Sequence, residues 1–164
     1  MFLDSRIPYE SYRLVKRDDY FVDKTALIDE LFPFLEVEKR FICITRPRRF
    51  GKSVVANMIG AFFGKAVNAE SLFDTLKIAS SEGYRTHLNQ HHVVYIDFSR
   101  MPQDCSTYAA YIGRISDGIK RDLEERYPGV CRTRVYDGDS SDCEIFRRIW
   151  TEHVRGIRYG DQSD

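Results

Sequence analysis

The sequence predicts an α/β fold in which a parallel sheet is flanked by helices. The 164 residues, 43% hydrophobic and 30% charged, are enough for one domain, so residues 1–164 are expected to form a single unit. Two short apolar runs, at residues 41–45 and 93–98, are typical of buried parallel strands. The chain between them has helical periodicity and is long enough for a right-handed βαβ crossover.

The first half of the chain contains one expected strand between two expected helices. Residues 1–24 are polar and aromatic, and no element is predicted there. Apolar residues at helical spacing from Leu27 to Leu35 predict a short helix, which Pro33 should end or kink. After the strand at 41–45, residues 52–63 predict a helix with one apolar face.

The second half predicts a second strand and two more helices. The strand at 93–98 follows an irregular connection around residues 72–78. A longer helix has apolar residues at 112, 115, 119 and 123 and should stop near residues 128–129. Ser141 and Glu144 have the spacing of a capping box, which predicts a last helix over residues 141–155.

The segment between the first strand and the next helix has the context of a phosphate-binding loop. Backbone amides of such a loop, together with the dipole of the following helix, make a site for a polyphosphate anion. Gly51 would let the backbone approach, Lys52 would reach the outer phosphates as the candidate catalytic cation, and Ser53 would join the shell of a Mg ion. The generic pattern is incomplete because Arg46 replaces its first glycine, and a tight basic turn is the alternative. The predicted nucleotide-binding residues are Pro47, Arg48, Arg49, Phe50, Gly51, Lys52 and Ser53.

Positive charge is concentrated around this loop although the whole chain is neutral. The 25 basic and 25 acidic residues cancel, which excludes a global field that would attract nucleic acid or anionic lipid. Residues 39–53 nevertheless contain six basic side chains and no acid. Such a strip is usually a solvated face, but beside an anion site it would attract ATP or a nucleic-acid backbone. A non-catalytic module that binds nucleic acid or protein is therefore the alternative to an ATP-binding domain.

The chain resembles the bacterial and archaeal AAA-ATPase-like family in four segments. They read YFVDKTALI at 20–28, TRPRRFGKS at 45–53, LFDTLKI at 72–78 and VVYIDFS at 93–99, and their order and spacing agree over about residues 6–125. In that family the first glycine of the loop is usually missing. The resemblance implies a P-loop NTPase-like sheet, ATP and Mg as cofactors, and a segment 20–25 near the nucleotide. Members often carry a PD-(D/E)XK nuclease-like module, through which nucleic acid would become a partner.

The sequence does not provide the acid that ATP hydrolysis requires. A P-loop ATPase holds magnesium with a Walker B carboxylate at a strand end and orients water with a neighbouring group. The resemblance implies an Ile-Asp-Glu-Tyr-like word that is absent up to Asp164, so the domain is expected to be truncated before that strand. Asp97, after the apolar run 93–96, is the substitute candidate for a metal ligand, and a carboxylate capping a loop is the alternative. ATPase activity is predicted only if the missing function is supplied.

Several other classes of site and location are not favoured. No apolar run approaches the roughly 18 to 20 residues of a membrane span, and the N-terminus lacks an export signal, which predicts a cytoplasmic protein without a membrane partner. The four cysteines are far apart and are interpreted as free thiols. His91 and His92 are interpreted as a polar loop entering a strand rather than a metal site.

Overall fold

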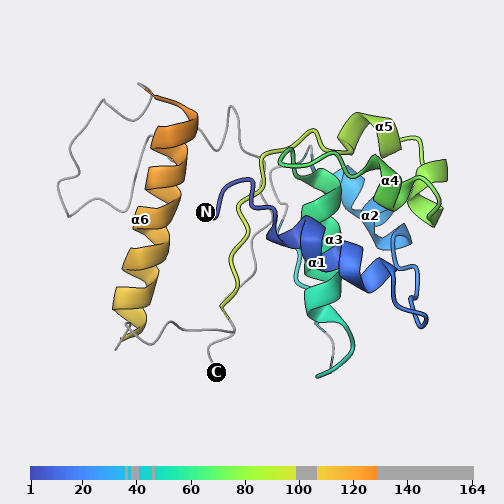
Figure 1. Cartoon of the computed structure of the whole chain (residues 1–164), viewed down its shortest axis with the longest axis horizontal. Coiled ribbons are helices and arrows are strands. Elements are labelled where there is room, and N and C mark those ends of the chain that lie inside the picture. The colour runs from blue at the N-terminus through green and yellow to red at the C-terminus, as the bar shows by residue number, and fades with distance from the viewer. Residues whose placement is uncertain (36, 38–40, 46, 99–106, 129–164) are drawn as a thin grey trace.

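A computed structural model of the protein describes residues 1–35, 37, 41–45, 47–98 and 107–128. Helix α6 stands apart from the group formed by α1 to α5, and the N-terminal residues and the segment before residue 98 run between them (Figure 1). None of the helices in these ranges has the length and apolar character needed to cross a bilayer. The elements are α1 (Ile7–Lys16), α2 (Ala26–Leu31), the 3-10 helix η1 (Phe32–Phe34), α3 (Lys52–Phe63), α4 (Glu70–Phe73), the 3-10 helix η2 (Lys77–Ser80), α5 (Tyr84–His87) and α6 (Tyr108–Arg126).

The α/β fold with a P-loop NTPase-like parallel sheet is wrong for the part of the chain that the structure describes. Its regular elements are all helical, and β pairing is limited to two isolated bridges, Leu3 with Val94 and Gly64 with His91. Residues 41–45 form no strand, and the Phe41 side chain is 85% exposed. A segment forms a β-strand only where a second segment pairs with it through backbone hydrogen bonds. The apolar run at 41–45 does not specify which segment that would be.

The second expected strand pairs with the N-terminal residues instead of with segment 41–45. The Asp4 amide donates to the Val93 carbonyl at 2.8 Å, and the Tyr95 amide donates to the Phe2 carbonyl at 2.9 Å. The single bridge that results is antiparallel, between Leu3 and Val94. The pairing between residues 2–4 and 93–95 is too short to form a strand. The predicted βαβ crossover between 41–45 and 93–98 is therefore absent from the part of the chain that the structure describes.

The helices predicted from periodicity are confirmed where the structure describes them. The predicted helix at 52–63 is α3, and the long helix ending near residue 128 is α6. The helix after residue 25 is α2, which ends at Leu31 and continues as one 3-10 turn around Pro33. Helix α1 was not predicted. The helix expected over 141–155, and Cys105, Cys131 and Cys143, lie outside the described residues; Cys43 is a free, exposed thiol.

The main core surrounds the C-terminal half of α3. Phe62 is fully buried, and its ring lies 5.1 Å from Phe63, 5.2 Å from Phe73 and 6.0 Å from Tyr84 between centroids. Helix α1 lies across α3 (Figure 1), and a Cβ built on Gly60 would come within 2.8 Å of the Pro8 Cβ. The absence of a side chain at residue 60 is therefore what allows the two helices to pack this closely.

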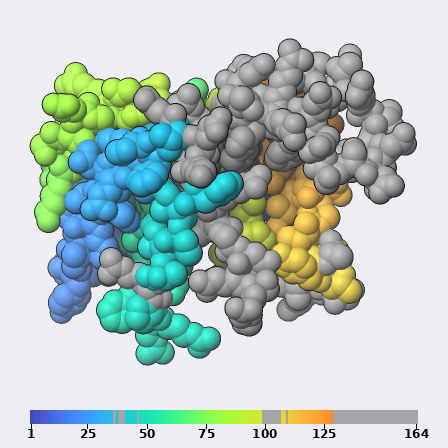
Figure 2. Space-filling model, turned by 180° about the vertical axis from the view of Figure 1, so that it is seen from behind, coloured from blue at the N-terminus to red at the C-terminus, as the bar shows by residue number. Residues whose placement is uncertain are grey.

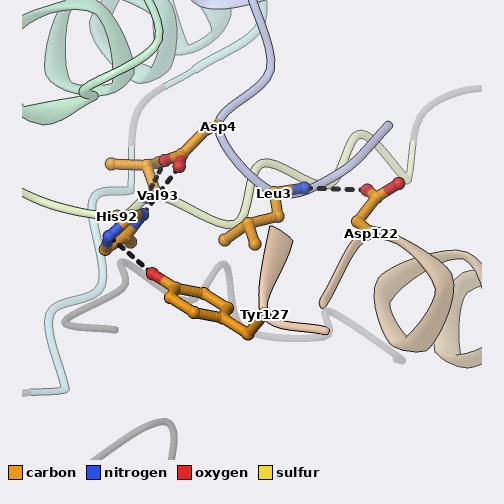
Figure 3. A network of polar contacts seen from close by, with 6 residues as sticks. All are labelled: Leu3, Asp4, His92, Val93, Asp122 and Tyr127. Carbon is orange, nitrogen blue, oxygen red and sulfur yellow. Dashed lines mark hydrogen bonds and ion pairs between the residues drawn. The ribbon is translucent and has the colours of Figure 1, made fainter. Parts of the chain in front are cut away.

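A second, smaller core joins α6 to the rest of the molecule. Leu3 packs against the buried face of α6, which consists of Tyr111, Ile115, Ile119 and Leu123. Beside it lies a polar network that includes the buried side chains of Asp4 and His92 (Figure 3). His92 Nδ1 contacts Asp4 Oδ2 at 2.7 Å and His92 Nε2 contacts the Tyr127 hydroxyl at 2.8 Å, while the Leu3 amide donates to Asp122 Oδ2 at 3.1 Å. These bonds satisfy polar groups that burial would otherwise make costly.

Truncating Phe62 is expected to destabilise the protein strongly. Phe62→Ala removes the ring at the centre of the main core and should lower the free energy of unfolding by about 3–5 kcal/mol, because the space cannot close fully. Urea unfolding followed by circular dichroism measures the change. Tyr20→Ala is the matched control, since Tyr20 is 90% exposed and its loss should change the stability by no more than about 0.5 kcal/mol. Equal effects of the two substitutions would contradict this description of the core.

Candidate functional site

The segment with the phosphate-loop pattern, residues 47–53 (loop 47–53), forms a tight turn that leads into α3. The Phe50 amide donates to the Pro47 carbonyl at 3.4 Å. Arg49 and Gly51 both have left-handed backbone conformations, with φ of +68° and +78°. A left-handed conformation is uncommon outside glycine, and at Gly51 it is available without steric strain. The turn places Gly51 directly before the first residue of the helix.

The N-terminus of α3 is open. In the described part of the chain no side chain caps this 12-residue helix, and its first helical bond runs from the Val55 amide to the Gly51 carbonyl at 2.9 Å. The amides of the first helical turn point away from any intrahelical acceptor and carry the positive end of the helix dipole. The segment around residue 50 projects into solvent at the lower edge of Figure 2. An anion could therefore reach these amides from solution.

Several cations surround this helix end. Lys52 extends over the turn, and its Nζ lies 3.5 Å from the Pro47 carbonyl oxygen. Arg48 and Arg49 are exposed. Lys24, which lies just before α2, brings its Nζ within 3.2 Å of the position that a Cβ on Gly51 would occupy. Loop 47–53 is therefore joined by Lys24, which belongs to the segment 20–25 that the family resemblance expects near the nucleotide. The geometry singles out its ammonium group, to which the sequence assigned no individual role.

Residues on both sides of Lys24 are held by hydrogen bonds to η2. Asp23 Oδ1 accepts from the Thr25 amide at 2.9 Å and from the Thr25 hydroxyl at 2.7 Å, while Asp23 Oδ2 accepts from the Lys77 amide at 2.8 Å. Thr25 Oγ1 in turn accepts from the Ile78 amide at 3.2 Å. Partial burial raises the pKa of the Asp23 carboxyl, but these hydrogen bonds and the charge of Lys77 outweigh it and hold the pKa below its ordinary value.

Asp97, the candidate metal ligand, lies in the segment that packs against α6. Its backbone carbonyl accepts from the Tyr111 hydroxyl at 2.9 Å, and its side chain is exposed. Burial and the nearby Asp97 charge raise the pKa of Tyr95. Within the described residues, no cluster of three or more His, Cys, Asp or Glu side chains is arranged to hold a metal ion. The magnesium roles of Asp97 and Ser53 stay predictions.

The adjacent histidines have separate partners. His91 Nε2 lies 3.1 Å from His87 Nδ1, with the two rings stacked, whereas His92 contacts Asp4 and Tyr127 in the buried network of Figure 3. His91 and His92 therefore do not point toward one common site. His91 and His92 directly precede the segment 93–98, which forms only the isolated bridge at Val94 and no strand.

Comparison with protein-family models matches residues 7–153 to the model described as Predicted AAA-ATPase. The matched range includes all of α1 to α6 and the whole of loop 47–53. Neither a curated protein nor a solved structure matches the chain.

The hydrogen bonds of Asp23 predict a stability that depends on acid pH. Because the pKa of Asp23 in the folded protein lies below its ordinary value of 3.8, its carboxylate stabilises the folded state fully above that value, and this stabilisation is lost as the pH falls through the folded pKa. Asp23→Asn cannot accept from both partners and should cost about 1–3 kcal/mol at pH 7. Urea unfolding of both proteins at pH 7 and pH 3 should show this difference shrinking at pH 3. A difference that is the same at both values would rule out a carboxylate role.

Proposed function

Because the chain belongs to the predicted AAA-ATPase family, we propose that loop 47–53 and the first turn of α3 bind the phosphate groups of ATP. The observation that carries this proposal is the open, uncapped N-terminus of α3 beside the ammonium of Lys52. An exposed helix N-terminus offers unpaired amides and a positive dipole to a phosphate, and a lysine adds a charge-assisted hydrogen bond. Membership of the predicted AAA-ATPase family supports a nucleotide as the molecule that carries this phosphate.

Each residue of the loop has a physical role in this proposal. Gly51 lets the backbone turn with a positive φ, so that the amides after it face the ligand without a side chain in the way. Lys52 neutralises the outer phosphates. Arg48 and Arg49 raise the local potential from their exposed positions, and the turn between Pro47 and Phe50 holds the loop in shape.

Magnesium would enter with the nucleotide. Mg ions keep several waters and are held by phosphate oxygens together with a few protein oxygens. Ser53, in the first turn of α3, is the proposed protein ligand, and its hydroxyl is exposed. The bound ion would neutralise phosphate charge. The proposal is limited to the binding of the nucleotide and its ion.

A second function is favoured by the exposed aromatic rings near the loop. Phe41 is 85% and Phe50 59% exposed, with Arg48 and Arg49 between them in sequence. Exposed aromatic rings beside arginines are the features with which proteins stack single-stranded nucleic acid. In this reading the same segment contacts a nucleic-acid backbone, either alone or alongside a nuclease-like module.

Lys52→Ala is expected to remove most of the affinity for Mg-ATP. Losing a charge-assisted hydrogen bond worth about 1.5–3 kcal/mol weakens binding by roughly 10- to 150-fold. Isothermal titration calorimetry of Mg-ATP into the wild type and the variant measures the change. Lys65→Ala is the matched control, because Lys65 is an exposed lysine just beyond the other end of α3 and should bind as the wild type does.

Two results would contradict ATP binding at loop 47–53. No heat with the wild-type protein, or equal affinity in the wild type and Lys52→Ala, would retire ATP binding at this loop. Titration of a single-stranded oligonucleotide at low and moderate salt tests the second function. Binding that weakens steeply with salt and that Lys52→Ala reduces would support the nucleic-acid reading.

Asp97→Asn tests whether that carboxylate takes part in metal binding. We expect the magnesium dependence of ATP affinity to be unchanged, because the backbone at Asp97 is bound to α6 through the Tyr111 hydroxyl. The measurement is a series of ATP titrations at increasing magnesium concentration for the wild type and the variant. A shallower magnesium dependence in Asp97→Asn would instead identify Asp97 as a ligand of the ion.

A further inference from the structure

We infer that Lys24 supplies a second ammonium group to loop 47–53, so that the site takes a chain of two or three phosphates rather than a single phosphate. This inference rests on the proposed function and extends it to a residue from a different part of the chain.

The position of Lys24 is the first argument. Its Nζ lies 3.2 Å from where a Cβ on Gly51 would stand, so it lies against the backbone of the loop just before α3. Lys52 starts the helix on the other side of that glycine. The two lysines therefore approach the same short stretch of backbone from different elements. Adjacent phosphates of a polyphosphate chain would allow each ammonium to contact a separate group.

The rigidity of the backbone around Lys24 is the second argument. Thr25 is fully buried, and its hydroxyl links Asp23 to the Ile78 amide. Asp23 also accepts from the Lys77 amide. These bonds fix the residues before and after Lys24 to η2 and leave its exposed side chain to reach toward the loop. A binding group on a fixed backbone loses less conformational entropy when its ligand binds.

The electrostatic setting is the third argument. A cation near a helix N-terminus meets the positive end of the dipole, which is unfavourable without an anion. Lys24 is exposed and lies beside loop 47–53, to which Arg48, Arg49 and Lys52 contribute further positive charge. A polyphosphate carries enough negative charge to neutralise several of these groups at once, which a monophosphate does not.

The experiment compares ligands that differ in the number of phosphates. Mg-ATP, AMP and inorganic tripolyphosphate are titrated calorimetrically into the wild type, Lys24→Ala, Lys24→Arg and the control Lys65→Ala. Lys24→Ala is expected to weaken ATP and tripolyphosphate at least tenfold and to leave any AMP binding within twofold of the wild type. Lys24→Arg should restore part of the loss because it keeps the charge. Circular dichroism and thermal melts establish that the variants are folded.

The possible failures are distinguishable. If the wild type binds Mg-ATP and Lys52→Ala abolishes this binding while Lys24→Ala binds like Lys65→Ala, the inference about Lys24 is overturned and ATP binding stands. If Lys24→Ala weakens AMP as much as ATP, the preference for a phosphate chain is overturned. If the wild type binds neither ATP nor tripolyphosphate, both this inference and the proposed function fail.

Discussion

The asymmetric burial of α3 is the constraint on which the rest of the structure depends. Its C-terminal half is buried on all sides, with Met58, Ile59, Phe62 and Phe63 in the core, whereas Lys52 and Ser53 in its first turn are exposed. Helix α1 packs against Gly60 so closely that α3 cannot shift along its axis without losing this contact. The core therefore anchors one end of the helix and presents the amides of the other end to solvent. A site on such an end is held in place by packing far from it.

Side-chain hydrogen bonds to backbone amides hold distant segments together in the part of the molecule that the structure describes. Asp23 and Thr25 bind the start of η2, and Asn89 Oδ1 accepts from the Ala69 amide at 2.7 Å. Asp4 Oδ1 accepts from the Val93 amide at 3.1 Å. Each such bond contributes about 1 kcal/mol, and more when the acceptor is a carboxylate. In this protein these side-chain hydrogen bonds join distant segments, as backbone hydrogen bonds between strands do in a β-sheet.

The sequence predicted the helices better than it predicted the pairing of segments. Helices α3 and α6 were recognised because their apolar residues recur within the helix itself, which is local information. The prediction of a strand at 41–45 was wrong because an apolar run does not specify the segment that pairs with it. Segment 93–98 pairs instead with residues 2–4, where no element was expected. Helix α1 carried a detectable signal, a proline in its first turn and the pair Glu10 and Arg13 at helical spacing. Loop 47–53 was recognisable from its glycine and lysine. The resemblance placed segment 20–25 near the nucleotide, but the approach of the Lys24 ammonium to Gly51 depends on how η2 holds Asp23 and Thr25, which no local pattern contains.

The most direct test of phosphate binding at the start of α3 is an NMR titration of the backbone amides with Mg-ATP. We expect the amide signals of Gly51, Lys52 and Ser53 to shift as nucleotide is added, because their N–H groups would donate to phosphate oxygens, while the amide signals of α6 stay unchanged. Saturating shifts in this first turn would locate the anion at the open end of α3. Unchanged signals at these residues at saturating nucleotide, or shifts that centre on α6, would show that the nucleotide does not bind at loop 47–53.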